Sequence, residues 1–285
     1  MATHSDAGSL RGGAERPDAP YALVAGLYVA ALLAPTAVGA VSTVVAGGAA
    51  RYVALLLAAT CVTTGAGWYV SRVPGLAVAL GRRDATWLLA VVPLPWQVGA
   101  FVALAAAGVD VPTAVALLGL FAGAAASLLG VALVAMSRTR HADAVLDGVD
   151  DLARWEARWP PRWRRVGKVT AVVGGLAAIL GLAARFVLGW EWAGSLYVFL
   201  LLSTPFAGMT NARTFRATGA GLAVEQPLQR TLRPWSAFES YTLTDEALVV
   251  RTAEPWRPAH RCDRTDVEDV DAVGTALGCH LPRRD

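Results

Sequence analysis

Long stretches without charge are the feature that most constrains this chain. No Asp, Glu, Lys or Arg occurs between Asp18 and Arg51, and several later stretches are similarly uncharged. A helix needs roughly 20 apolar residues to cross the hydrocarbon core of a bilayer. Charged residues make up 16% of the chain and hydrophobic residues 55%, whereas soluble domains carry roughly a quarter charged residues. The sequence therefore predicts an integral membrane protein.

Six membrane-spanning helices are predicted from the positions of the uncharged stretches. They cover about Tyr21–Ala46, Tyr52–Ser71, Thr86–Ala107, Pro112–Met136, Val169–Leu188 and Trp192–Thr210. A polar tail, residues 1–20, which we expect to be disordered, precedes this membrane domain of residues 21–210. Arg185 lies near the end of the fifth span, from where it can reach the headgroups. A five-span arrangement is the alternative, and it would place the fourth loop and the C-terminal tail on opposite faces of the membrane.

Loops that are rich and poor in arginine alternate along the chain. Basic residues occur in the N-terminal tail, the second and fourth loops and the C-terminal tail, whereas the third and fifth loops have none and the first has only Arg51. Short loops rich in Lys and Arg stay preferentially in the cytoplasm. The alternation predicts a multi-pass protein of the plasma membrane with six spans and both termini in the cytoplasm.

The fourth loop combines a helical rhythm with many Trp and Arg residues. Apolar residues recur at helical spacing from His141 to Trp159, and Pro160 ends the pattern. We expect an amphipathic helix at about 141–159 on the inner membrane surface. The residues expected at this interface, close to anionic lipid headgroups, are Trp155, Trp159, Trp163, Arg158, Arg162, Arg164 and Arg165. Such tryptophans can also stack on nucleic-acid bases, but beside a membrane the lipid interpretation is favoured and no nucleic-acid partner is expected.

The C-terminal tail, residues 211–285, has the frequent charges of a soluble domain. Five short runs bounded by turn residues predict strands. They are Thr214–Thr218, Gly221–Gln226, Leu228–Pro234, Phe238–Thr244 and Ala247–Thr252. Thr265 and Glu268 have the spacing of a capping box, and apolar residues then recur at helical spacing until Gly278. We expect a small β-rich domain closed by one amphipathic helix.

Two segments of the tail, Thr218–Val224 and Leu228–Trp235, resemble bacterial pleckstrin-homology (PH)-like domains. The first has two glycines followed by apolar residues, and the second is a basic strand that ends in Pro-Trp. The resemblance implies a PH-like fold, in which seven strands are closed by a helix, and it implies that Trp235 anchors the sheet to that helix. The expected fold class is an all-α polytopic membrane bundle followed by a small cytoplasmic α+β domain of PH-like type.

Pro93, Pro95 and Gln97 are an unusual group inside the third span. Prolines free backbone carbonyls, and a glutamine needs a hydrogen-bond partner in lipid. Broken helices of this kind occur at transporter sites. A kink satisfied by a neighbouring helix is the favoured interpretation, because proline is common in transmembrane helices. Gly119 and Gly123 in the fourth span have the spacing of a close helix contact.

Groups that support catalysis inside a membrane are missing from the predicted spans, none of which contains Asp, Glu or His. This disfavours intramembrane proteolysis and ion-coupled transport. The Cys and His residues at 260–262 and 279–280 lack the usual spacing of a zinc site, and no cofactor is expected. The expected function is that of a non-enzymatic membrane-anchored binding or scaffold protein acting through its PH-like domain. A small-molecule transporter or channel with a broken third helix around Pro93–Gln97 is the alternative.

Overall fold

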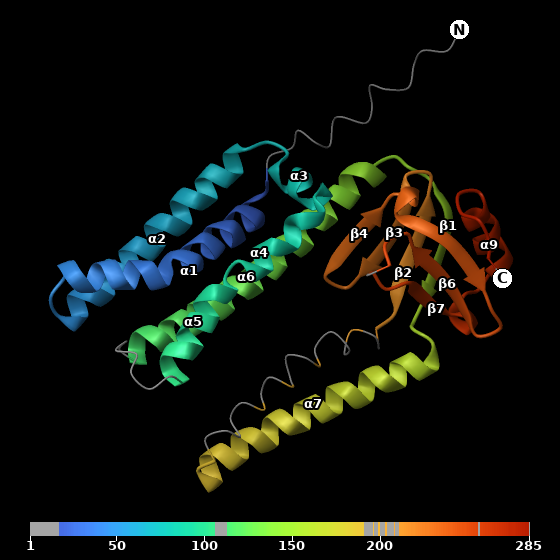
Figure 1. The fold of residues 1–285 in the computed structure, drawn as a ribbon. Coiled ribbons are helices and arrows are strands. Elements are labelled where there is room, and N and C mark those ends of the chain that lie inside the picture. The colour runs from blue at the N-terminus through green and yellow to red at the C-terminus, as the bar shows by residue number, and fades with distance from the viewer. Residues whose placement is uncertain are drawn as a thin grey trace. The chain divides into compact units, whose positions relative to one another are not determined.

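The computed structural model describes residues 17–105, 113–190, 211–255 and 257–284, together with residues 196, 199, 203 and 208 (Figure 1). The chain divides into two compact units. The first consists of Met1–Asp147 and Leu228–Thr231, and the second of Gly148–Pro227 and Leu232–Asp285. The first unit is mainly helical, whereas the second combines a long helix with β-sheet.

The helices of the first unit are organised around one long helix, α6. The elements are α1 (Ala19–Val44), α2 (Gly48–Arg72), α3 (Leu76–Arg82), the 3₁₀ helix η2 (Asp84–Trp87), α4 (Leu88–Val91), α5 (Leu94–Ala105) and α6 (Thr113–Leu146). α1, α3, α4 and α5 pack on α6, and α2 packs on α1 (Figure 1). Small residues allow this packing: a Cβ atom added at Gly26 of α1 would lie 2.2 Å from the carbonyl oxygen of Thr63 in α2.

Within the described residues, five helices are long and apolar enough to cross a membrane. They cover Ala19–Val44, Gly48–Arg72, Asp84–Leu104, Val115–Leu146 and Pro161–Arg185. The first five predicted spans are thus confirmed as long apolar helices, which is the pattern of a membrane protein. Large apolar side chains such as Leu57, Phe121 and Ile179 are exposed on them, as expected of surfaces that face lipid. The predicted sixth span, 192–210, lies outside the described residues except at four isolated positions.

The second unit contains α7 (Pro161–Leu188) and two antiparallel sheets, except that residues 229–231 in the edge strand of the larger sheet belong to the first unit. The four-stranded sheet has the order β1-β2-β3-β4, and the three-stranded sheet has the order β5-β6-β7. The strands are β1 (Asp151–Ala157), β2 (Arg213–Thr218), β3 (Gly221–Gln226), β4 (Gln229–Arg233), β5 (Phe238–Leu243), β6 (Ala247–Thr252) and β7 (His260–Asp263). A short helix, α9 (Val270–Gly278), follows near the C-terminal end. Five of these strands lie within one or two residues of the predicted runs, and β1 and β7 are additional.

The prediction of an amphipathic helix at 141–159 is wrong. Helix α6 continues to Leu146, Gly148 takes a left-handed conformation with φ of +71°, and β1 follows. β1 pairs antiparallel with β2, with Trp155 opposite Phe215. A strand forms because apolar side chains alternate with charged ones, so that Trp155 and Ala157 are buried on one face. The β-rich region therefore includes residues 151–157 as well as strands within the predicted 211–285.

The start of α9 also differs from the prediction. Thr265 lies in a 3₁₀ turn, η6 (Arg264–Asp266), rather than at a helix start. The N-cap of α9 is Asp269, whose carboxylate accepts a hydrogen bond of 2.8 Å from the backbone N–H of Ala272. Asp269 satisfies an otherwise unpaired donor of the first turn. The predicted end of the helix at Gly278 is confirmed.

One hydrophobic core joins both sheets and α9. Its centre contains the buried side chains of Leu222 from β3, Leu248 and Val250 from β6, and Leu277 from α9. Residues of β1 complete it, because the indole of Trp155 stacks on Phe215 with ring centroids 5.4 Å apart. The second unit is consequently held together by strands that come from both sides of α7 in the sequence.

Candidate functional site

The third span is interrupted where its prolines occur. α4 ends at Val91 and α5 begins at Leu94, with Pro93 buried between them. The side-chain Nε2 of Gln97 donates a hydrogen bond of 2.9 Å to Oγ of Ser127 in α6. A Cβ atom at Gly123 would lie 2.7 Å from Cγ of Gln97, so the glycine provides the space for this side chain. These contacts give the Pro93–Gln97 segment a packing role, and a transport role remains a prediction.

Two arginine–tryptophan pairs lie at the start of α7. The guanidinium carbon of Arg213 lies 5.5 Å from the ring centroid of Trp159, and that of Arg261 lies 5.8 Å from the ring centroid of Trp163. The two indoles are neighbours, with centroids 6.2 Å apart. The start of β2 and the middle of β7 thereby bring two cations to the first turn of α7. We call Trp159, Trp163, Arg213 and Arg261 the Arg–Trp cluster.

Positive charge in and beside this cluster is largely uncompensated. Among the described residues, no ion pair is made by the side chains of Arg158, Arg162, Arg165, Lys168, Arg213 and Arg261. Arg164 differs, because it pairs with the buried carboxylate of Asp263 at 3.2 Å. Burial lowers the pKa of Arg213. Of the arginines predicted at the membrane interface, Arg164 is therefore paired with a carboxylate, whereas Arg158, Arg162 and Arg165 have no such partner among the described residues.

Trp155 does not belong to the interface where it was predicted. It is buried in the core, stacked on Phe215, so it cannot reach a bilayer surface. Trp159 and Trp163 are only partly buried and remain candidates for that interface. Arg213 and Arg261 were missed as members because they lie far along the sequence. The pairing of β1 with β2 brings Arg213 to this place, and a hydrogen bond from the N–H of Asp263 to the carbonyl of Arg158 brings the end of β7 there.

A second candidate site is the groove between β1 and α9, which we call the β1–α9 groove. It encloses about 330 Å³ and is lined by Leu152–Glu156 of β1, Thr214, Asp266, Glu268, Asp269, Ala272 and Val273. β1 is the edge strand of its sheet. Just after β1 ends at Ala157, the carbonyl of Arg158 accepts a 2.7 Å hydrogen bond from the N–H of Asp263 at the end of β7. The groove runs beside β1, and no strand among the described residues pairs with the outer edge of β1.

Acidic side chains dominate the rim of this groove. Glu156 and Glu268 are exposed and make no ion pair within the described residues. Asp266 accepts a 2.9 Å hydrogen bond from the backbone N–H of Arg158. Arg154 is the basic residue of the lining, and it reaches Glu225 at 3.8 Å. The groove therefore offers an acidic rim to an incoming chain.

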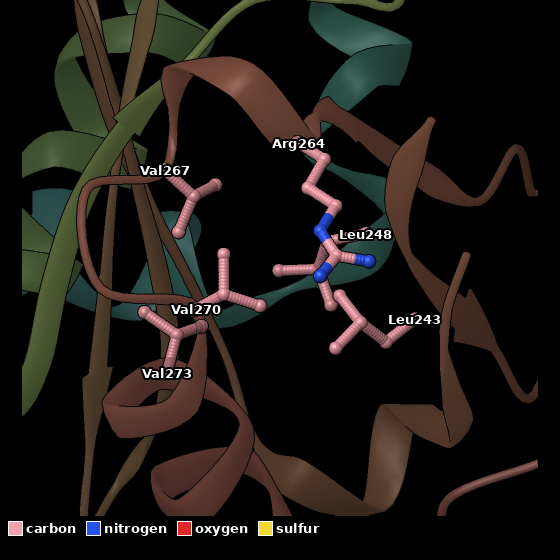
Figure 2. A pocket seen from close by; sticks show the side chains of 6 residues that line it. All are labelled: Leu243, Leu248, Arg264, Val267, Val270 and Val273. Atoms are coloured by element: carbon pink, nitrogen blue, oxygen red, sulfur yellow. The ribbon is translucent and has the colours of Figure 1, made fainter. Parts of the chain in front are cut away.

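The space beneath α9 shows how this helix closes the core. Figure 2 shows Val267, Val270 and Val273 on one side, with Leu243 and Leu248 opposite them. This space is too narrow to admit a water molecule. Arg264 borders it and donates a 2.9 Å hydrogen bond to the carbonyl of Thr244 in the turn between β5 and β6. The gap is a packing feature of the core rather than a binding site.

Trp235 is half-buried at the edge of the same core. Its Nε1 donates a 2.9 Å hydrogen bond to the carbonyl of Thr218 at the end of β2. Its ring stacks on His280, which lies just after α9, with centroids 4.6 Å apart. Trp235 thus joins β2 to the C-terminal end of the closing helix.

Two titratable side chains of the core are held uncharged. Burial, assisted by the charges of Arg233 and Arg213, lowers the pKa of His260 to about 4. Burial raises the pKa of the Cys262 thiol to about 12, so this thiol is unreactive. Among the described residues, no group of three or more His, Cys, Asp and Glu side chains is placed to hold a metal ion.

Comparisons with protein families, with curated proteins and with solved structures found no match for this chain.

Proposed function

We propose that this chain is a non-enzymatic, membrane-anchored binding protein, and that its second unit presents a PH-like domain to the cytoplasm. The observation that carries the proposal is the set of strands: four antiparallel strands, then three, closed by α9. Seven strands and a closing helix are what the PH-like resemblance implies. β1 supplies the strand that precedes α7, and the remaining strands follow residue 211.

The pairing of β1 with β2 also supports six membrane spans. Strands of one sheet lie on the same side of a membrane, because lipid does not admit an irregular or open-edged β-structure. β1 precedes α7 and β2 follows it. If α7 crosses the bilayer once, the chain has to return between residues 189 and 212. The uncharged stretch at 192–210 is long enough for that return.

The β1–α9 groove is the binding surface in this proposal, and an extended basic segment of a partner protein is its ligand. An added strand can hydrogen-bond to the outer edge of β1, while its side chains enter the groove. The acidic rim of Glu156, Asp266 and Glu268 favours lysine and arginine in that strand. Apolar side chains can alternate with them to contact Val273.

A fluorescent peptide with alternating Arg and Val tests this function. The full-length protein, kept in detergent, should raise the anisotropy of the peptide in a saturable way that weakens with salt. Reversing two rim charges, with Glu156→Arg and Glu268→Arg together, should weaken binding at least about tenfold, since each rim charge steers and holds the basic ligand. The matched double variant, Glu239→Arg with Asp245→Arg, changes exposed acids outside the groove and should bind like the parent.

A second probe separates strand addition from simple charge attraction. Placing proline at every valine position keeps the charge but removes the backbone donors that an added strand needs. This peptide should bind at least about tenfold more weakly than the Arg–Val peptide if strand addition is responsible. Equal binding of both peptides, or equal loss in both double variants, would contradict the proposed ligand.

A further inference from the structure

The Arg–Trp cluster has a feature that folding of the domain does not explain. Arg213 and Arg261 are only partly exposed, and neither has a carboxylate partner within the described residues. Elsewhere in the same unit, partly buried arginines are neutralised: Arg216 pairs with both Asp151 and Glu225. Partial burial of an unpaired cation is unfavourable unless an anion accompanies it.

Asp263, the carboxylate two residues after Arg261 in β7, is already engaged by other groups. Asp263 accepts hydrogen bonds from the backbone and the hydroxyl of Thr265 through Oδ1, and from Arg164 through Oδ2. The N-terminus of α7 adds to the positive potential, because no side chain caps it and the helix runs for 28 residues. The two guanidiniums thus lie on two adjacent indoles at an uncapped helix start, and neither has a carboxylate partner among the described residues.

The position of the cluster in the sequence indicates where its anion comes from. Trp159 lies two residues before α7 begins, and α7 is long and apolar enough to cross a membrane. Arg213 begins β2, three residues after the uncharged stretch at 192–210. Trp159 and Arg213 therefore each lie in the chain next to one end of a hydrophobic segment, Trp159 just before α7 and Arg213 just after the stretch at 192–210. Tryptophan favours this interfacial level, and arginine there attracts anionic lipid.

We propose that the Arg–Trp cluster binds the phosphate of an anionic lipid headgroup at the membrane surface, with Arg213 and Arg261 as its ligands and Trp159 and Trp163 as its walls. A guanidinium presents paired N–H donors that match two phosphate oxygens. The indoles orient the guanidiniums through cation–π contact and fill the apolar level below the headgroup. This site is separate from the β1–α9 groove, and its test does not depend on the peptide ligand proposed there.

The test uses the full-length protein in nanodiscs that contain phosphatidylcholine with a minor fraction of phosphatidylglycerol. Native mass spectrometry of the ejected protein measures how many molecules of each lipid remain bound. The parent should retain phosphatidylglycerol in preference to phosphatidylcholine. The double variant Arg213→Gln with Arg261→Gln should lose most of this preference. Its affinity for phosphatidylglycerol relative to phosphatidylcholine should fall about 25-fold, because each basic residue at an anionic surface typically contributes about 1 kcal/mol.

Two further variants make the result specific. Arg284→Gln removes an exposed charge that pairs with Glu239 of β5, two strands away from Arg261 in β7, and should retain the parent's lipid preference. The double variant Arg213→Lys with Arg261→Lys keeps both positive charges. It serves as a control in case the glutamine variant loses lipid because it does not fold. It should retain more phosphatidylglycerol than the glutamine variant, but less than the parent because the paired donors are lost. Equal retention in all four proteins would overturn the proposal.

Inorganic phosphate distinguishes a lipid site from a site for soluble phosphate. If the headgroup is the ligand, phosphate added in large excess over the lipid should leave the bound phosphatidylglycerol in place, because the acyl chains hold the headgroup at the surface. Displacement of the lipid by phosphate at a lower concentration than that of the lipid itself would overturn the lipid assignment.

Discussion

The indole of Trp155 stacks on the phenyl ring of Phe215, with centroids 5.4 Å apart and planes 9° from parallel. Trp155 precedes α7, and Phe215 follows both α7 and the predicted sixth span. The contact therefore closes a long loop of chain that contains hydrophobic segments. The core of the second unit can be completed only after these segments have been synthesised. The four-stranded sheet is connected to them through β1, which precedes α7, and through β2, which follows the stretch at 192–210.

Replacing Trp155 should destabilise the second unit strongly. Trp155→Ala removes a buried aromatic ring from the core, which typically costs about 3–5 kcal/mol. Hydrogen exchange of the β2 and β3 amides in the full-length protein should accelerate accordingly. Leu152→Ala is the matched control, because this side chain is exposed on the same strand and its loss should change stability by no more than about 0.5 kcal/mol. Unchanged exchange in Trp155→Ala would show that the ring does not support the sheet.

The tail alone should not fold into the domain. A fragment of residues 211–285 lacks β1, so Phe215 and the edge of β2 would be exposed. We expect this fragment to give a poorly dispersed NMR spectrum and no cooperative melting. A fragment in which residues 149–159 are joined by a flexible linker before residue 211 should fold cooperatively, because it restores the missing strand. Cooperative melting of the tail without β1 would contradict this role of the strand.

Five strands could be predicted from local sequence because their alternation and turns are self-contained. Gly221 illustrates such a signal: its φ of +152° suits glycine, and an added Cβ atom would lie 2.1 Å from the carbonyl oxygen of Arg233. β7 has only four residues, His260–Asp263, which is too short for an alternation to stand out. The capping-box prediction failed because Asp269, closer to the helix, is the residue that satisfies the first turn.

β1 was missed although the sequence contains its signal. Ala153, Trp155 and Ala157 alternate with charged residues, which is the period of a strand half-buried in a sheet. The apolar residues at helical spacing from His141 onward form a helix only as far as Leu146, where α6 ends. Nothing local indicates which strand β1 pairs with, because β2 lies beyond α7. The membership of Arg213 in a cluster with Trp159 depends on that pairing and could not be predicted either.

The close contact between α4 and α6 should tolerate no side chain at Gly130. A Cβ atom there would lie 2.3 Å from the carbonyl oxygen of Leu89, which is backbone and cannot move aside. Gly130→Leu should lower the melting temperature of the detergent-solubilised protein, since overpacking commonly costs about 1–3 kcal/mol or more. Gly99→Leu on α5 is the control, because no atom lies within 4 Å of the added Cβ. Equal melting temperatures for both variants would rule out this contact.

Acidification should weaken the second unit through His260. Burial, followed by the charges of Arg233 and Arg213, lowers the pKa of this imidazole to about 4, whereas an unfolded histidine titrates near about 6.5. Between these values the unfolded chain binds a proton that the folded chain does not, so stability falls as the pH falls. The loss should begin below about pH 6.5 and reach up to about 3 kcal/mol near about pH 4, with no contribution from His260 above that window.

The variant His260→Phe isolates this effect from other titrating groups. Phenylalanine retains a ring for the edge contacts with Phe215 and Phe238 but binds no proton. Urea unfolding of the domain in the full-length protein, repeated across the acidic range, should show a shallower loss of stability in the variant than in the parent. Carboxylates titrate in both proteins, so the difference between the two curves reports His260. Parallel curves, or an NMR titration midpoint of the imidazole near about 6.5, would show that His260 is accessible to protons in the folded domain.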